Sequence, residues 1–244
     1  MGHPAKTNNA GNTGNTGNTG NPGNPGNPGN PGKRGEAVVC VHGLWLSGFA
    51  TRYWRTHLAG AGYAAQSFSY PTLRSTLVKN CASLLRFVES LPQQRVHLCG
   101  HSLGAVTIAA MLQEQGWKLP GKTLGRIVLV GPPFQGSHAG KSLVDKGLGD
   151  MLAGKPLQDW LLGPRPVVPQ HVDLGVIAGD ANLGMGRVIA PRLARPHDGT
   201  VSVAETQVSG AREHIVLPVG HTAMLMSQQV VKRMIRFIDS GSFG

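Results

Sequence analysis

The chain has 244 residues, of which 40% are apolar, 5% aromatic and 14% charged, and its formal net charge is +11 at pH 7. This length and apolar content suffice to bury a sizeable core, so a wholly disordered protein is excluded. Three cysteines are too few, and odd in number, for a disulfide scaffold. No uninterrupted apolar run approaches the roughly 20 residues that a membrane-spanning helix needs. We therefore expect a globular domain without a transmembrane segment.

The positive charge raises non-specific attraction to nucleic acids, anionic lipid surfaces and acidic substrates. The basic residues are scattered along the chain, with one loose concentration at Arg187, Arg192 and Arg195. No basic tract is interleaved with aromatic residues as in a nucleic-acid-binding arm. We expect no nucleic-acid partner, and surface contact with anionic lipid stays open. The sequence does not indicate an oligomeric state.

Residues 1–35 differ in composition from the rest of the chain. From Gly11 to Gly32 the sequence reads Gly-Asn-Thr three times and then Gly-Asn-Pro four times. Glycine at every third position is typical of collagen, but the triplets are few. Such a segment has no apolar surface to offset the entropy cost of ordering. We therefore expect a disordered tail over residues 1–35 and a single folded domain over residues 36–244.

After residue 36, short apolar runs alternate with segments of helical periodicity. The predicted strands are residues 37–41, 64–70, 96–99, 127–130, 174–178 and 215–219, and the predicted helices are residues 76–88, 103–115 and 222–239. Most of the strand runs are continuous rather than alternating, which indicates burial on both faces of a parallel sheet. We predict an α/β fold with a doubly wound, mostly parallel sheet and helices on both faces.

The residues that follow these strands are the first place to look for a site, because ligands of such sheets bind beyond the carboxyl ends of the strands. Glycines and reactive side chains gather there, at His42-Gly43, Gly100-His101-Ser102, Gly131-Pro132, Gly179-Asp180 and Gly220-His221. His42 and His101 have no partners at metal-ligand spacing, so we expect them to shape loops rather than to bind zinc.

Gly100-His101-Ser102-Leu103-Gly104 fits the pattern G-x-S-x-G. The pentapeptide alone is a weak signal, but it lies between a predicted strand and a predicted helix, and a nucleophile elbow needs that context. The glycines relieve crowding at the sharp turn, and the following helix N-terminus favours negative charge. We therefore predict that Ser102 is a nucleophile rather than only a helix N-cap.

A serine hydroxyl needs a neighbouring base to become a good nucleophile. In this arrangement the order along the chain is Ser, then Asp or Glu, then His. His221 follows the last predicted strand, so we expect it at the same sheet edge as Ser102 and predict that it is the base. Asp180 and Asp198 both lie between these two residues, and either carboxylate is able to orient the imidazole. The residues alone leave both acids open.

These features together resemble the α/β-hydrolase family, and within it the small single-domain lipases and esterases. The resemblance covers essentially residues 36–240 and rests on four motifs in one order, namely HGLW at residues 42–45, GHSLG at 100–104, HDGTV at 197–201 and GHT at 220–222. It implies that Asp198 rather than Asp180 is the acid. It also implies an oxyanion hole formed by the backbone N–H groups of Leu44 and Leu103.

The sequence also departs from larger members of that family. No long insertion after Gly131 is available for a large cap domain. Residues 148–163 are apolar enough for a small lid, although such a stripe is more often an ordinary packing helix. We expect Trp45, Leu46 and Phe49 to line the substrate pocket.

The resemblance implies a carboxylic ester hydrolase, an esterase or lipase, that acts on a small-molecule or lipid ester without a metal or cofactor. The same residues would serve a thioesterase or an amidase, and a non-catalytic binding protein on this scaffold is a further alternative. Cys40, Cys81 and Cys99 are expected to be buried and reduced. Together with the lack of a signal peptide in residues 1–10, this favours a cytoplasmic location.

Overall fold

The computed structural model describes residues 1–2, 35–145, 154–181 and 193–244, with the side chains of 142–145 excepted. The predicted tail falls almost wholly on residues 3–34, outside this described part. Within it, six strands form one sheet in the order β2-β1-β3-β4-β5-β6, and every pairing is parallel. The strands are β1 (Glu36–Val41), β2 (Ala64–Phe68), β3 (Arg95–His101), β4 (Thr123–Val130), β5 (Leu174–Gly179) and β6 (Glu213–Leu217). The predicted α/β fold with a parallel sheet is therefore confirmed.

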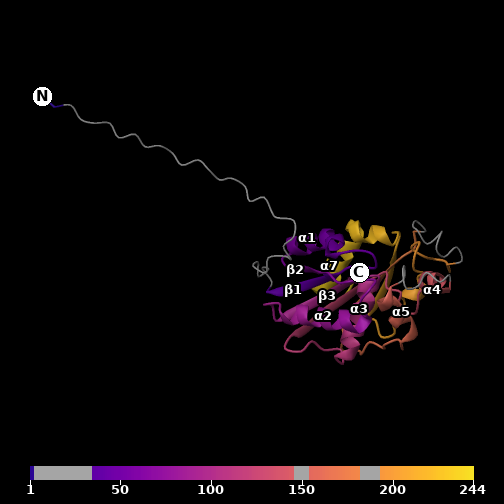
Figure 1. Cartoon of the computed structure of the whole chain (residues 1–244). Helices are drawn as coiled ribbons and strands as arrows, with labels where there is room; N and C mark the ends of the chain where they lie inside the picture. The colour runs from indigo at the N-terminus through magenta and orange to yellow at the C-terminus, as the bar shows by residue number, and fades with distance from the viewer. Residues whose placement is uncertain (3–34, 146–153, 182–192) are drawn as a thin grey trace.

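Helices cover both faces of the sheet (Figure 1). Helices α2 (Leu77–Glu89), α3 (Leu103–Glu114) and α5 (Lys155–Leu162) pack on one face, and α1 (Arg52–Gly60) and α7 (Gln228–Ser240) pack on the other. Successive residues of a strand point to opposite faces. Val39 and Val41 accordingly belong to the core under α2 and α3, whereas Val38 and Cys40 belong to the core under α1 and α7.

One predicted helix is wrong in its extent. The segment predicted as a single helix over 222–239 consists of a 3-10 helix, η4 (Thr222–Met226), followed by α7. The break falls at Ser227, whose backbone is extended and whose hydroxyl accepts a hydrogen bond from the backbone N–H of Val230 at 3.3 Å. An N-cap of this kind starts a new helix even where the apolar stripe continues.

The remaining elements are short. They are η1 (Gly48–Thr51), α4 (His138–Asp145) and η3 (Ala204–Thr206). None of the helices in the described part of the chain is both long and apolar enough to span a bilayer. The three cysteines are unpaired and buried, and burial raises the pKa values of the Cys40 and Cys81 thiols to about 12. Such thiols are poor nucleophiles.

Candidate active site

Ser102 lies in the sharp turn between β3 and α3. Its backbone has φ 52° and ψ −118°, in the left-handed half of conformational space that a non-glycine residue seldom adopts. The turn is fixed because the Ser102 N–H donates to the carbonyl of Val130 at 2.9 Å. Strain of this kind costs on the order of 1–3 kcal/mol and is characteristic of functional sites.

The two glycines of the pentapeptide permit this turn. A Cβ added at Gly100 would lie 2.6 Å from the Cα of Ala105, and one added at Gly104 would lie 2.3 Å from the carbonyl oxygen of Val41. Neither contact is tolerable, because the opposing atoms belong to the backbone. The glycines thus let α3 begin directly against β1 and β3, with Ser102 at its N-terminus.

Asp198 and His221 form a buried hydrogen-bonded pair. Nδ1 of His221 donates to Oδ2 of Asp198 at 2.7 Å, and the backbone N–H of His221 donates to the Asp198 carbonyl at 2.9 Å. The other carboxylate oxygen accepts from the backbone N–H groups of Thr200 and Val201 at 2.9 and 2.7 Å. Both side chains are therefore held in one orientation, and the His221 ring presents its other nitrogen, Nε2, away from the carboxylate.

The same contacts set the charge of Asp198. Burial by itself raises the pKa of this carboxyl. The charge and hydrogen bond of His221, together with the two backbone N–H groups, lower the pKa by more than burial raises it. The net result is a pKa below the ordinary value, so Asp198 is ionised at neutral pH. A buried carboxylate that is fully hydrogen-bonded is suited to stabilising a positive charge on the adjacent imidazole.

The ends of β4 and β5 approach this pair closely enough to require glycine. Gly131 has φ +56°, and a Cβ there would lie 3.1 Å from Cε1 and Nδ1 of the His221 ring. A Cβ at Gly179 would lie 2.9 Å from the Cβ of Asp198 and 2.2 Å from the carbonyl oxygen of Val219. These two glycines therefore leave the space that the acid and the histidine occupy at the sheet edge.

His101 connects the turn that carries Ser102 to the loop that carries His221. Its Nε2 donates to the carbonyl of His221 at 2.9 Å, and the two rings lie 4.7 Å apart. Burial, aided by the nearby His221 charge, lowers the pKa of His101 to about 3, so its ring is neutral at physiological pH. Its Nδ1 is buried and has no hydrogen-bond partner among the described residues, and it faces Gly43, where an added Cβ would be 2.9 Å away.

His42 plays a similar part in the loop after β1. Its Nδ1 donates to the carbonyl of Gly43 at 2.9 Å, and its Nε2 accepts the backbone N–H of Tyr70 at 3.3 Å. The Tyr70 ring stacks on the imidazole, and its hydroxyl donates to the His42 carbonyl. This arrangement holds the loop that carries Leu44 and Trp45. Among the described residues, no three His, Cys, Asp or Glu side chains converge as they would around a metal ion.

A cavity of about 210 Å³ opens beside Ser102 and His221. Its described lining is mostly apolar and consists of Leu44, Trp45, Leu46, His101, Ser102, Leu103, Pro133, Ser137, Ala139, Gly140, Leu157, Thr200, Val201, His221 and Thr222. The segment of residues 148–163 was predicted from the sequence as a lid or a packing helix, but the wall that α4 and α5 form was not predicted, because nothing local marks Gly140 or Leu157 as lining residues.

Of the other residues predicted from the sequence to belong to the site, some line the cavity and others do not. Trp45 and Leu46 line the cavity, whereas Phe49 is 73% exposed outside that lining, with the guanidinium of Arg52 over its ring at 5.7 Å. Asp180 is exposed and lines a different cavity. The acid bonded to His221 is thus Asp198.

Residues 146–153, which include the first part of the predicted lid, lie outside the described residues. The rest of that segment forms α5, in which Leu157 and Trp160 are buried in the core. Trp160 donates its ring N–H to the carbonyl of Pro133 at 3.2 Å. The described part of the segment is therefore a packing helix.

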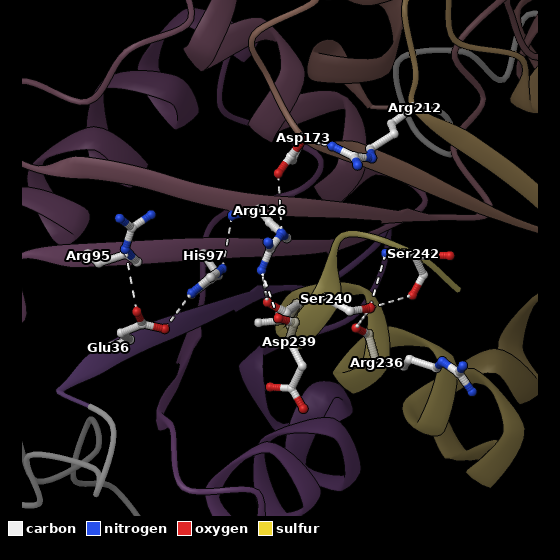
Figure 2. A network of polar contacts seen from close by, with 11 residues as sticks. Glu36, Arg95, His97, Arg126, Asp173, Arg212, Arg236, Asp239, Ser240 and Ser242 are labelled. Carbon is white, nitrogen blue, oxygen red and sulfur yellow. Dashed lines mark hydrogen bonds and ion pairs between the residues drawn. The ribbon is translucent and has the colours of Figure 1, made fainter. Parts of the chain in front are cut away.

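A larger hollow, of about 700 Å³, lies at the opposite, amino edge of the sheet. Glu36 forms an ion pair with Arg95 and accepts a hydrogen bond from the buried His97 (Figure 2). Arg126 donates to Asp173 at 3.2 Å and to the carbonyl of Ile238 at the end of α7. These charges are engaged in holding strands and helix ends together.

Comparison with solved structures identifies the fold. A lipase from Bacillus licheniformis, BlEst2 in its mature form, matches with a TM-score of 0.68 and 17% identity over 91% of this chain and 100% of its own. RedJ-thioesterase from the prodiginine pathway of Streptomyces coelicolor matches with a TM-score of 0.57 and 15% identity over 92% of this chain and 91% of its own. The chain therefore has the α/β-hydrolase fold.

A third solved structure shares the fold over a smaller part of its own length. Phospholipase PlaB from Legionella pneumophila, in complex with thio-NAD, matches with a TM-score of 0.59 and 14% identity over 85% of this chain and 62% of its own. No family model matches the sequence, and no curated protein matches it. The likeness lies in the fold, and the chemistry has to be argued from the residues of the site.

Proposed function

We propose that this chain is a serine hydrolase that cleaves carboxylic esters, with Ser102 as nucleophile, His221 as general base and Asp198 as the acid that orients it. The observation that carries the proposal is the buried 2.7 Å hydrogen bond between Asp198 and His221, because the His221 side of this pair lines the same cavity as the strained Ser102. The lipase, thioesterase and phospholipase with this fold add support.

In the acylation step, Oγ of Ser102 attacks the ester carbonyl carbon, and its proton passes to Nε2 of His221. Nδ1 of His221 holds its proton against Asp198, so Nε2 is the nitrogen left free to accept one. The carboxylate then stabilises the imidazolium. The tetrahedral intermediate collapses by breaking the bond to the alcohol oxygen, and the leaving alcohol takes the proton from His221.

We assign the oxyanion hole to the backbone N–H groups of Leu44 and Leu103, both of which belong to cavity-lining residues. Leu103 is the first residue of α3, so the helix N-terminus also favours the developing negative charge. A single donor of this kind is worth roughly 3–4 kcal/mol in the transition state. In deacylation, water attacks the acyl-enzyme by the same route and releases the carboxylic acid and free Ser102.

The test is hydrolysis of p-nitrophenyl esters by the wild type and by Ser102→Ala, together with labelling by a fluorophosphonate probe. We expect ester turnover and covalent labelling in the wild type, and the loss of both in a folded Ser102→Ala variant. Parallel assays with thioesters and amides of the same acyl chain distinguish an esterase from a thioesterase or amidase. If the folded wild type neither turns over any of these substrates nor reacts with the probe, the hydrolase proposal fails. The remaining interpretation is then a non-catalytic binding protein on this scaffold.

A further inference from the structure

We infer that the cavity beside Ser102 accepts a short acyl chain, of about eight carbons or fewer, and that Leu157 sets this limit. The inference rests on the proposed ester hydrolase and adds its substrate class. It follows from the size of the cavity, from the contact between its two helices, and from the way in which α5 is anchored.

The size of the cavity limits what can enter it. An engineered apolar cavity of about 150 Å³ in another protein holds benzene, with its six carbons. By proportion, the 210 Å³ beside Ser102 holds a group of about eight carbons. The described lining is dominated by apolar side chains, which suits an alkyl chain better than a sugar or a charged group.

Two helices form one wall of this cavity without a gap at their point of contact. Gly140 of α4 and Leu157 of α5 both line the cavity, and a Cβ added at Gly140 would lie 3.1 Å from Cδ2 of Leu157 and 3.0 Å from Oγ of Ser137. The helices touch so closely that even a methyl group is tight between them. An alkyl chain that reaches this wall meets the Leu157 side chain.

Helix α5 is anchored by contacts on two sides, so we expect Leu157 to resist displacement by a longer chain. Trp160, on the next turn of α5, donates to the carbonyl of Pro133 and packs edge-on against Phe134, with ring centroids 5.3 Å apart. The Asp159 carboxylate accepts the backbone N–H of Leu77 at 2.9 Å and so joins α5 to the start of α2. Leu157 itself is only 6% exposed.

The experiment is a series of p-nitrophenyl esters of increasing acyl length, run on the full chain and compared as kcat/KM. We expect a maximum at about eight carbons or fewer, and at least a tenfold fall within the next two carbons, since a single methylene in an apolar pocket changes kcat/KM by about 10-fold or more. Leu157→Ala should move the maximum toward longer chains by about two carbons, because it removes most of a buried side chain that lines the cavity and so enlarges the space for the acyl chain.

Two further variants complete the experiment, one as a control and one as an independent test. Leu162→Ala makes the same chemical change on the same helix at a side chain that is 89% exposed, and it should leave the chain-length profile unchanged. Gly140→Ala adds a methyl group between Ser137 and Leu157 and should shorten the preferred chain. This second variant keeps the inference testable if Leu157→Ala does not fold, which a thermal melt will show.

The outcomes separate this inference from the proposed function. A wild type that prefers acyl chains of about 12 carbons or more, or an active Leu157→Ala variant with an unchanged profile, overturns the chain-length inference and leaves the ester hydrolase standing. If the folded wild type cleaves no ester of any length and is not labelled by a fluorophosphonate, the proposed function fails and the inference fails with it.

Discussion

At the amino edge of the sheet, Asp173 pairs with Arg126 and Arg212, and the Asp173 and Arg126 side chains remain 33% and 29% exposed. At the carboxyl edge, Asp198 is completely buried and His221 is 8% exposed. The hollow at the amino edge is the larger of the two, at about 700 Å³ against about 210 Å³. Yet only the smaller one brings a strained serine together with a buried acid and histidine.

Under the proposed function, the volume of a hollow is a poor guide to the position of the active site on this molecule. Ion pairs in contact with solvent contribute at most about 1 kcal/mol each, because water and salt screen them. A buried carboxylate fixed by three hydrogen-bond donors keeps its charge and its direction. Matched substitutions at the two edges should therefore have very different effects.

The largest contrast is expected between Asp198→Asn and Asp173→Asn. An asparagine at 198 cannot accept the Nδ1 proton of His221 as a carboxylate does, so the ring no longer presents a basic Nε2 toward the substrate. We expect kcat for ester hydrolysis to fall about 10⁴-fold. Asp173→Asn should leave kcat within about twofold, because its partners lie at the far edge of the sheet.

Steady-state kinetics on both variants, with folding checked by circular dichroism, provides the measurement. Comparable losses of kcat in the two variants would contradict the assignment of Asp198.

The second contrast concerns two glycines with positive φ. Gly131→Ala places a methyl group 3.1 Å from the His221 ring, and displacing a reacting group by a fraction of an ångström should lower kcat by about 10- to 100-fold. Gly121 has φ +66°, and no atom of the described residues lies within 4 Å of an added Cβ, so Gly121→Ala introduces the backbone strain without a contact to the site.

Both glycine variants should lose about 1 kcal/mol or more of unfolding free energy, because alanine is strained at positive φ. Only the first should lose activity. Denaturant melts and kinetics on the same preparations will show whether the two effects separate. An unimpaired Gly131→Ala enzyme would mean that His221 has room to move without penalty.

The third prediction concerns stability against acid. His101 has a pKa of about 3 in the folded chain, far below its value when unfolded, so the unfolded state binds more protons below about pH 6.5. The free energy of unfolding should therefore fall as the pH drops from about 6.5 toward 3, by up to about 1.4 kcal/mol per pH unit for this one group. His42 and His97, whose pKa values burial also lowers, add to the slope.

His101→Gln keeps a donor for the His221 carbonyl and removes the titrating ring. The slope of unfolding free energy against pH, measured by urea melts between about pH 6.5 and 4.5, should decrease by about one proton. An identical slope in the variant would show that His101 carries a proton in the folded state, contrary to its burial.

The smallest effect is expected at the amino edge. Arg212→Ala removes an exposed partner of Asp173 and should cost at most about 1 kcal/mol of unfolding free energy. This cost should shrink further at about 1 M salt, where the Debye length is about 3 Å. A larger loss of unfolding free energy that persists in high salt would contradict this expectation and would show that the ion pairs at the amino edge contribute substantially to stability.

The central strands β1, β3, β4 and β5 could be predicted closely from the sequence because each contains an apolar run that is buried on both faces, whereas the edge strands β2 and β6 are mostly half-buried. The prediction fell short where that signal fades. β4 begins at Thr123 rather than at residue 127. Its first four residues include Gly125 and Arg126 at the polar amino edge, so they do not form an apolar run. α1 was not predicted, because Trp54 and Leu58 are its only buried residues and Thr51 makes no capping hydrogen bond.

The site was less predictable than the fold. Motif order selects Ser102, Asp198 and His221, and their roles remain predictions until activity is measured. The need for glycine at Gly131 and Gly179 arises from loops much further along the chain, so no local pattern reveals it. The wall made by Gly140 and Leu157 likewise depends on how α4 and α5 meet in space.

The strained backbone at Ser102 has a practical consequence for crystallography. Glycine adopts a positive φ freely, so Ser102→Gly should raise the unfolding free energy by about 1 kcal/mol while removing the hydroxyl that would react. Such a variant cannot form an acyl-enzyme. An intact ester soaked into its crystals would persist long enough to be seen in electron density. The position of its carbonyl oxygen would show directly which backbone N–H groups donate hydrogen bonds to it.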